Sequence, residues 1–304
     1  MIPFLTWLIK KQIELIFGAF NLNHEIQEQR NSTVKPFLKW VGGKRQLIPE
    51  IVKFIPRSYA HYFEPFLGGG ALFFSQLPKY ATISDVNEEL VNCYQVVQQA
   101  PTALIAELKT HIYDKEYYYH VRNLDRDPVA FSALTNIARA ARLIYLNRSG
   151  FNGMYRVNSK GQFNVPFGTY KNPNIVNEQV ILKANEALQS AEIKHASFET
   201  IVASAKKGDF IYFDPPYMPL STTSSFTKYA KDDFSEHWQE KLALTCRSLH
   251  EKQIRFIVSN SYCDEIKELY DGFNFAEIKA KRSINSKADG RAAISELLIH
   301  NAHC

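Results

Sequence analysis

The sequence predicts an α/β fold that is interrupted by a mostly helical insertion. Short apolar runs typical of strands alternate with helical patterns between residues 34 and 93, and again between residues 176 and 304. A glycine run, Gly68 to Gly70, joins the first of these strands to a helix. Between residues 94 and 175 the pattern changes to helices rich in Tyr, Arg and Asn, which indicates a separate module.

The composition is that of an ordinary globular protein. The chain has 304 residues, of which 45% are hydrophobic and 22% charged, enough for one large domain or two smaller ones. A net charge of +5 permits a polyanionic partner without requiring one. The four cysteines, Cys93, Cys246, Cys263 and Cys304, show neither a disulfide pattern nor the spacing of a zinc site, so no metal is predicted. A reducing, cytoplasmic setting is expected.

Residues 1–33 predict an amphipathic helix followed by a polar linker. Its apolar residues recur at helical spacing: Leu5, Leu8, Ile9, Ile13, Ile16, Phe17 and Phe20. Lys10, Lys11 and Glu14 interrupt the apolar stretch and no cleavage site follows, so neither a membrane span nor a signal peptide is predicted. We expect this helix to pack on the body of the protein or on a partner, without stable membrane association. Docking at a membrane surface is the alternative.

The other elements follow in order from residue 34. Before the insertion we expect strands at 61–66 and 81–86 and helices at 71–77 and 87–100. Within the insertion, residues 131–146 predict one helix with Phe131, Leu134, Ile137, Ala141 and Ile144 on its apolar face. After the insertion we expect strands at 191–198, 209–214, 254–260, 275–283 and 294–301.

The glycine turn is the first candidate binding feature. Gly68 and Gly70 follow a strand and open a helix, where a glycine turn lets the backbone approach a nucleotide closely. A GxGxxG site would need glycine at position 73, which is Phe73, so a nicotinamide dehydrogenase is disfavoured and a nucleoside-like cofactor is favoured. Asp85 ends the next strand, where a carboxylate can accept both ribose hydroxyls. A purely structural turn remains the alternative.

The stretch "PFLKWVGGKRQL", residues 36–47, is the second candidate. Trp40 offers a flat apolar face, and Lys44 is a cation able to bind a ligand carboxylate. Gly42 and Gly43 form a tight turn between them. The alternative is a buried tryptophan beside an ordinary turn.

The stretch "FIYFDPPYMPLS", residues 210–221, carries the strongest chemical signal. Asp214 falls at the carboxyl end of a predicted strand, the edge at which α/β sheets bind ligands. An exocyclic amine on a nucleobase is a poor nucleophile, because its lone pair is delocalised into the ring. Asp214 and the carbonyl of Pro215 can both accept hydrogen bonds from such an amine, and Tyr217 can stack on a base swung out of a duplex. A proline-rich turn is the alternative.

Five segments together resemble a known family. They are "FLKWVGGKR", "FEPFLGGG", "SDVNEEL", "YLNRSGFNGMYRVNSKGQFNVPFGTYKNP" and "DFIYFDPPYMPLS". In this order they look like the Dam-type DNA adenine-N6 methyltransferases, and they are especially similar to the DpnM-like GATC modification methylases. The resemblance runs from Val34 to the C-terminus. It implies a Rossmann-like S-adenosylmethionine-dependent methyltransferase sheet at 34–93 and 176–304, with a target-recognition domain at 94–175.

The resemblance also implies roles for individual residues. The S-adenosylmethionine site would be lined by Trp40, Lys44, Gly68, Gly70, Asp85 and Asp214. Asp214, Pro215 and Tyr217 would hold a flipped adenine, and the methyl group would move by direct in-line displacement. No cysteine follows a proline as in cytosine-C5 methylases, so a covalent intermediate with the base has no candidate nucleophile.

The DNA contacts implied by the resemblance lie mainly in the insertion. Phe151 and Asn152 would enter the duplex while Met154 and Arg156 contact base edges, and Arg156 can bond guanine O6 and N7 together. The remaining DNA-facing residues of the resemblance would be Lys39, Pro166 and Tyr170. Independently of the resemblance, the charge of the stretch "KAKRSINSKADGR" predicts a basic hairpin in which Arg282 and Arg291 bind phosphates, with a solvated face as the alternative. For the insertion segment, a solvated loop is the alternative.

The predicted function is methylation of adenine N6 in double-stranded DNA, within GATC, by base flipping. The resemblance also allows a cognate restriction endonuclease system. Two alternatives stay open: a cytosine-N4 methyltransferase, whose motif usually begins with serine where this chain has Asp214, and a non-catalytic DNA-binding protein on the same fold.

Overall fold

Seven strands form one mixed sheet in the computed structural model, which describes residues 34–217, 236–280 and 294–301. The strands are β1 Tyr62–Glu64, β2 Ala81–Asp85, β3 Ala191–His195, β4 Phe210–Phe213, β5 Arg255–Ser261, β6 Asn274–Ala280 and β7 Ile294–His300. Their order is β3-β2-β1-β4-β5-β7-β6. The first five are parallel, and β7 runs antiparallel to both β5 and β6. The predicted α/β fold is confirmed.

The helices connect these strands and build the insertion. They are α2 Ile48–Ile51, α3 Ala71–Gln76, α4 Glu88–Gln99, α5 Pro101–Leu108, α6 Lys115–Asn123, α7 Pro128–Ser132, α8 Asn136–Ser149, α9 Glu178–Leu188, α10 Phe198–Val202, α11 Glu236–Glu251 and α12 Asp264–Leu269. Short 3-10 turns are η1 Lys44–Gln46, η2 Val52–Phe54, η3 Leu124–Arg126 and η4 Phe151–Gly153. Side-chain caps fix several starts; for example, Asn87 accepts a hydrogen bond from Leu90 N at the start of α4.

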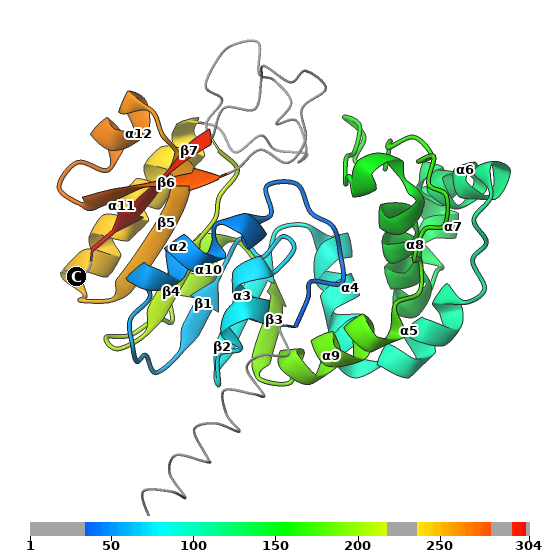
Figure 1. The fold of residues 1–304 in the computed structure, drawn as a ribbon, viewed down its shortest axis with the longest axis horizontal. Coiled ribbons are helices and arrows are strands. Elements are labelled where there is room, and N and C mark those ends of the chain that lie inside the picture. The colour runs from blue at the N-terminus through cyan, green and yellow to red at the C-terminus, as the bar shows by residue number, and fades with distance from the viewer. Residues whose placement is uncertain (1–33, 218–235, 281–293, 302–304) are drawn as a thin grey trace, which may run out of the picture. The chain divides into compact units, whose positions relative to one another are not determined.

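The two ends of the sheet carry different neighbours. In Figure 1, strands β5, β7 and β6 lie at one end with α11 and α12, and helices α5 to α8 lie beyond β3 at the other. Helix α4 packs against both α8 and α9 and so runs from the sheet into the insertion. The predicted insertion start at residue 94 lies inside α4. The described residues from 35 onward form one compact unit; the predicted division at 94 and 175 stays a prediction.

The main core lies between the central strands and α11. All four residues of β4 are buried, as expected for a parallel strand covered on both faces. Ile211 and Phe213 of β4 pack with Phe256 and Val258 of β5 and with Leu242 of α11. This packing holds the carboxyl end of β4 rigidly, and the next residue in the chain is Asp214.

The insertion has a small core of its own. Tyr118 and Val121 of α6 pack with Tyr145 and Leu146 of α8 and with residues from the loop that follows α8. That loop contains no regular strand, but it is drawn together by the isolated bridges Gly150 to Phe167 and Val157 to Phe163. The insertion therefore combines a helical body with one long structured loop.

The prediction of a single helix over residues 131–146 is wrong. Helix α7 ends at Ser132 and α8 begins at Asn136. The break occurs because Thr135 adopts an extended conformation and its hydroxyl accepts a hydrogen bond from Ala138 N, the geometry of a helix N-cap. The spacing of apolar residues alone cannot reveal a helix cap that lies within the apolar pattern.

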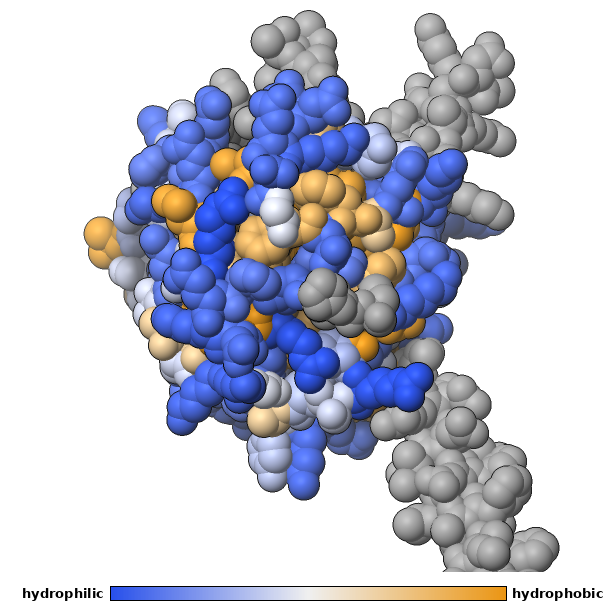
Figure 2. Space-filling model, turned by 90° about the vertical axis from the view of Figure 1, so that its left-hand side faces the viewer, coloured by the Kyte–Doolittle hydropathy of each residue, from blue (hydrophilic) through white to orange (hydrophobic). Residues whose placement is uncertain are grey.

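Strand β6 forms one edge of the sheet. Glu277 and Lys279 are exposed along it, and charged side chains of this kind discourage pairing with strands of other molecules. Phe275 of the same strand is also exposed, at 40%. Figure 2 shows the side of the molecule that carries this end of the sheet, where hydrophilic residues surround a central group of hydrophobic ones.

The amphipathic helix and linker predicted at residues 1–33 lie outside the described residues, as do Arg282 and Arg291. None of the described helices combines the length and the apolar character needed to cross a bilayer.

Candidate active site

Asp214 lies directly after β4, at the edge where the carboxyl ends of the parallel strands meet. Lys44 Nζ is 2.9 Å from Asp214 Oδ1 and 3.8 Å from Glu296 Oε2. The same ammonium donates to the carbonyl of Gly42 at 2.9 Å. Lys44 is only 5% exposed, so its charge is largely removed from water and needs these two carboxylates as partners.

Tyr217 completes this cluster. Its hydroxyl donates to Glu296 Oε2 at 2.5 Å, and Lys44 Nζ lies over its ring, 4.4 Å from the centroid. Lys44 thus contacts three side chains from two other segments: Asp214, Tyr217 and Glu296. The phenol ring of Tyr217 is fixed at its hydroxyl end by Glu296 and at its face by Lys44.

The carboxyl group of Asp214 titrates in an unusual range. Burial raises the pKa of Asp214 to about 6 against the opposing effect of the Lys44 cation, and the Glu296 carboxylate adds to the rise. The Asp214 side chain retains 21% exposure, which leaves it open to a bound molecule. At neutral pH it is an ionised hydrogen-bond acceptor whose charge is weakly solvated.

A second buried acid, Glu64, ends the neighbouring strand β1. Burial raises the pKa of Glu64 to about 8, although the hydrogen bond from Tyr62 Oη at 2.7 Å opposes this shift. Glu64 is therefore largely protonated at neutral pH. Of these two acids at the strand ends, Asp214 is therefore the one that is mostly ionised at neutral pH.

The glycine turn is tied to Asp85 by a backbone hydrogen bond. Gly68 N donates to Asp85 Oδ2 at 3.0 Å, and Asn87 N donates to Asp85 Oδ1 at 2.9 Å. Each carboxylate oxygen keeps capacity for a further hydrogen bond. Gly68 has φ of +48°, and a β-carbon there would lie 2.9 Å from the indole of Trp40. Glycine is thus required at position 68 by both conformation and packing.

Trp40 lies between the glycine turn and the insertion. Its side chain lies so close to the turn that a β-carbon would come within 2.9 Å of it at Gly68 and 3.0 Å at Gly69. The indole of Trp40 stacks on the ring of Tyr155, which belongs to the insertion. The ring centroids are 5.0 Å apart and the interplanar angle is 22°. Trp40 is therefore held between two segments at the border of the candidate site, and Tyr155 is a neighbour that the sequence did not predict.

Asn147 joins the same two regions through hydrogen bonds. Its Oδ1 accepts from Lys39 N at 2.9 Å, and its Nδ2 donates to Lys39 O and to Gly153 O, each at 2.8 Å. Asn147 is 1% exposed. Because it connects segment 39–44 with the turn at 151–153, these two segments are held in one fixed arrangement.

Replacing Asn147 by leucine is expected to destabilise the protein by on the order of 3 kcal/mol, because three backbone groups lose their partner at once. Urea unfolding followed by circular dichroism measures this free energy. Asn123→Ala, at an exposed position at the end of α6, is the control and is expected to change stability by less than about 0.5 kcal/mol. Equal losses in the two variants would contradict the role given to Asn147.

The segment predicted to read DNA lies on the surface of the insertion. Phe151 is 49% exposed, and Asn152 adopts a left-handed conformation with φ of 55°. Met154 is half-buried. Arg156 donates from Nε to Asn164 Oδ1 at 2.6 Å and from Nη2 to Asn164 O at 3.1 Å, which fixes the orientation of its guanidinium.

The remaining predicted DNA contacts lie beside this segment. Pro166 is exposed and its carbonyl accepts from Phe151 N at 2.9 Å. Lys39 Nζ lies over the ring of Tyr170, 5.0 Å from the centroid, and Tyr170 Oη donates to Gly150 O at 3.0 Å. An open pocket of about 420 Å³ adjoins these residues, lined by Lys39, Arg148, Tyr170, Lys171, Asn172, Pro173 and Asn174.

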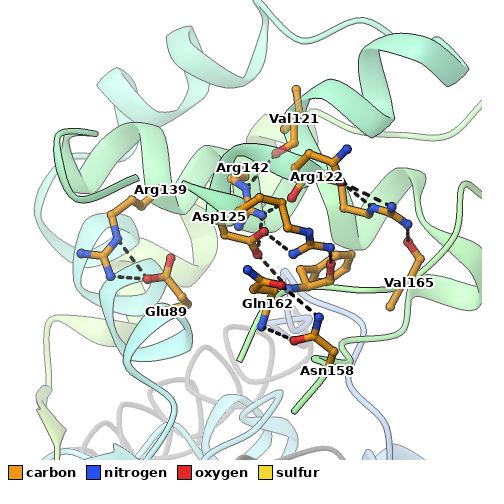
Figure 3. Close-up of polar contacts among 12 residues, drawn as sticks. Glu89, Val121, Arg122, Asp125, Arg139, Arg142, Asn158, Gln162 and Val165 are labelled. Atoms are coloured by element: carbon orange, nitrogen blue, oxygen red, sulfur yellow. Dashed lines mark hydrogen bonds and ion pairs between the residues drawn. The ribbon is translucent and has the colours of Figure 1, made fainter. Parts of the chain in front are cut away.

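Asp125 anchors the loop that carries Arg156. Its Oδ2 pairs with Arg142 Nη2 at 2.8 Å and accepts from Phe163 N at 2.8 Å, while its Oδ1 pairs with Arg126. Figure 3 shows this cluster, with Asn158 and Gln162 bonded across the neighbouring turn. The loop is therefore fastened to the helical body by buried charge-assisted hydrogen bonds, which limit its freedom.

Several residues of the site were not predicted. Glu296 is the main one, and its only sequence signal is a single acid in the apolar strand "ISELLIH". Tyr155 and Asn147 carry no recognisable signal, because their roles depend on contacts across the fold. The structure does bring Lys44 into contact with both Asp214 and Tyr217, and it joins the glycine turn to Asp85.

The chain is similar to known DNA methyltransferases. Residues 40–284 match the family described as D12 class N6 adenine-specific DNA methyltransferase. The chain is 46% identical to the Type II methyltransferase M1.LlaDCHI of Lactococcus lactis subsp. cremoris, over 90% of this chain and 98% of that protein. It is 42% identical to the Type II methyltransferase M.MjaIII of Methanocaldococcus jannaschii, over 88% and 99%. It is 36% identical to the DNA adenine methylase of Haemophilus influenzae, over 87% and 92%.

The family match covers most of the chain and includes the glycine turn, Asp85, the insertion and Asp214. It confirms the predicted resemblance, and it favours adenine N6 over the cytosine-N4 alternative. This protein therefore belongs to the D12 class of N6 adenine-specific DNA methyltransferases.

Proposed function

We propose that this protein transfers a methyl group from S-adenosyl-L-methionine to adenine N6 within GATC in double-stranded DNA, by base flipping and direct in-line transfer. The observation that carries the proposal is the fixed cluster of Lys44, Asp214 and Tyr217 at the carboxyl end of β4. It offers a carboxylate acceptor and an aromatic face at the edge of the sheet where ligands bind.

The residues at this edge fit the charge of the cofactor. S-adenosylmethionine carries a sulfonium, an ammonium and a carboxylate, and when bound it supplies an electrophilic methyl group. Asp85 and Asp214 suit its hydroxyls and positive charges, and Lys44 suits its carboxylate. We propose that Trp40, Gly68 and Gly70 complete the site; the turn of Gly68 presents its backbone beside Asp85.

The target amine would be held by Asp214 and by the carbonyl of Pro215. Two hydrogen bonds from the amine to these acceptors would orient its lone pair away from the ring. Asp214 can accept because its carboxyl is mostly ionised at neutral pH. Tyr217 would stack on the flipped adenine, with its ring already fixed by Glu296 and Lys44.

Residues 94–175 would act as the target-recognition domain. Phe151 and Asn152 would enter the duplex, Met154 and Arg156 would contact base edges, and Lys39, Pro166, Tyr170, Arg282 and Arg291 would line the remaining DNA surface. The exposure of Phe151 and the fixed guanidinium of Arg156 support these roles. The GATC sequence rests on the resemblance of this segment to Dam-type enzymes.

The names of two relatives support a biological setting for this activity. Two of them are named type II methyltransferases, which supports a role beside a cognate restriction endonuclease that cleaves the same unmethylated site. A DNA substrate suits the cytoplasm of a prokaryotic cell, where we place the protein.

Transfer of labelled methyl groups to short duplexes tests the proposal. We expect incorporation into duplexes with GATC and none into duplexes in which each base of the site is changed in turn. Prior methylation of adenine N6 in GATC is the matched control and should abolish incorporation. Incorporation at another adenine would overturn the assigned sequence. No incorporation anywhere would favour the non-catalytic DNA-binding alternative.

The pH dependence of kcat/KM should show an acid limb near pH 6. Below this pH, Asp214 becomes protonated and can no longer accept two hydrogen bonds, so kcat/KM is expected to fall about tenfold per pH unit. Lys44→Met should move the limb to higher pH, since the Lys44 cation lowers the pKa of Asp214. Lys53→Met, at an exposed lysine outside the site, is the control. An unchanged limb in Lys44→Met would contradict the assignment.

A further inference from the structure

Two buried side-chain amides, called the amide chain below, form a series of hydrogen bonds from strand β5 to residues 214–217, the DPPY loop. Asn260 of β5 and Gln239 of α11 are 0% and 1% exposed. Asn260 Nδ2 donates to Gln239 Oε1 at 3.0 Å, and Gln239 Nε2 donates to the carbonyl of Pro216 at 3.0 Å. Pro216 lies between Pro215 and Tyr217, the two residues proposed to contact the flipped base.

The direction of this chain is fixed at both ends. Ser261 N can only donate, and it bonds Asn260 Oδ1 at 2.8 Å, so Asn260 must present its amide nitrogen to Gln239. Gln239 must then accept with its oxygen and donate with its nitrogen. The carbonyl of Pro216 can only accept, so every donor in the chain meets an acceptor in one arrangement alone.

From these contacts we propose that Gln239 and Asn260 are positioning residues for methyl transfer, which set the orientation of the DPPY loop. The inference rests on the proposed function, because it concerns the same loop. The prolines at 215 and 216 have no N–H group, so the loop can be held through its carbonyls but not through donors of its own at these positions.

The physical effect is to anchor Tyr217 from two sides. Gln239 holds the carbonyl of Pro216 and therefore the peptide plane that leads into Tyr217. Glu296 holds the hydroxyl at the far end of the Tyr217 ring. Because the ring of Pro216 restricts its φ, holding this peptide also limits the direction of the Pro215 carbonyl. Both proposed contacts with the base therefore depend on the amide chain.

Three substitutions break the chain in different ways. Gln239→Leu removes both of its hydrogen bonds. Gln239→Glu keeps the size of the side chain but sets an ionised oxygen against the carbonyl of Pro216. Asn260→Asp changes no atom near the loop, yet its carboxylate oxygen would turn the Gln239 amide over, so that Oε1 faces Pro216. This remote variant tests the direction of the chain.

The control is Gln98→Leu in α4. Gln98 also spans two backbone carbonyls, with Nε2 donating to Leu188 O at 2.7 Å and to Ala191 O at 2.8 Å. It lies outside the candidate site, so it reports the general cost of losing an inter-element amide. Thermal unfolding of all four variants provides the comparison of stability.

The measurement is the single-turnover rate of methyl transfer to a GATC duplex, with cofactor affinity determined separately. We expect the three chain variants to lose about 10- to 100-fold in rate, as for a misplaced reacting group. Cofactor affinity should change less than about threefold, and Gln98→Leu should keep the wild-type rate. Wild-type rates in Asn260→Asp and Gln239→Leu, or an equal loss in Gln98→Leu, would overturn the inference.

A pH series adds a second readout. When Glu replaces Gln239 and becomes protonated, its O–H can donate to the carbonyl of Pro216 again. The rate of Gln239→Glu divided by the wild-type rate should therefore rise as pH falls. Because the titration of Asp214 affects both rates, it cancels in this ratio. A constant ratio would contradict the positioning role. If the wild-type protein itself transfers no methyl group, the proposed function fails, and this outcome is distinct from the failure of the amide chain.

Discussion

Replacing Asp214 by asparagine is expected to lower the rate of methyl transfer by about 10³-fold, the usual scale for losing a group that acts on the reacting proton or amine. Asparagine has nearly the same shape and can keep one oxygen toward Lys44, which lies 2.9 Å from Asp214 Oδ1. Its amide nitrogen would then face the target amine, donor against donor. Single-turnover incorporation of labelled methyl measures the loss.

Asp214→Ala is the harsher variant. It should lower the rate of transfer by a similar factor. Among the described residues it also leaves the buried Lys44 with Glu296, at 3.8 Å, as its one charged partner. Cofactor binding is therefore expected to weaken more in Asp214→Ala than in Asp214→Asn, and equilibrium dialysis with labelled cofactor separates the two effects.

Asp209→Asn provides the matched control. Asp209 is a buried acid that directly precedes β4, at the end of the strand away from Asp214. It accepts a hydrogen bond from Lys206 N at 2.8 Å. Its loss should reduce stability and leave the transfer rate of the folded protein unchanged. Near-wild-type turnover in Asp214→Asn would remove Asp214 from the chemistry.

The position of Asp214 could be predicted because its signal is local. An apolar run followed by two prolines defines where β4 ends, whatever the rest of the fold does. The same holds for Asp85 at the end of β2 and for the glycine turn before α3. These features need only the chain on either side of them.

Glu296 could not be predicted, because its role depends on strand pairing. Strand β7 runs antiparallel to β5 and brings Glu296 opposite Ser261, close to the end of β5. Neither the partner strand nor the register can be read from "ISELLIH" alone. The amides of Gln239 and Asn260 are similar, since each acquires meaning only through the other and through Pro216.

The insertion shows where periodicity misleads. A continuous apolar pattern predicted one helix over 131–146, but a capping threonine divides it into α7 and α8. The loop after α8 carries few apolar residues in a regular pattern, and yet it is well fixed, because Asp125 and Asn147 satisfy its backbone from the helices. Its order comes from buried polar contacts that no local pattern records.

Replacing Arg156 by alanine is expected to reduce discrimination at one guanine of the site by about 1 to 3 kcal/mol, or roughly 5- to 150-fold. The guanidinium uses Nε and one Nη2 hydrogen on Asn164, and within the described part of the chain its Nη1 hydrogens have no bonding partner, so they can reach a base edge. Competition between GATC and duplexes with one guanine substituted measures the ratio of kcat/KM values.

Arg156→Lys separates base reading from charge. Lysine keeps the positive charge that attracts any duplex but lacks the planar fork that bonds O6 and N7 together. If Arg156 reads guanine, both variants lose discrimination and bind altered sites almost as well as the native site. If it contacts a phosphate instead, alanine weakens binding to every sequence alike, and lysine restores it. Uniform weakening with unchanged preference would therefore assign Arg156 to the DNA backbone, and the guanine would have to be read by another side chain of the same loop.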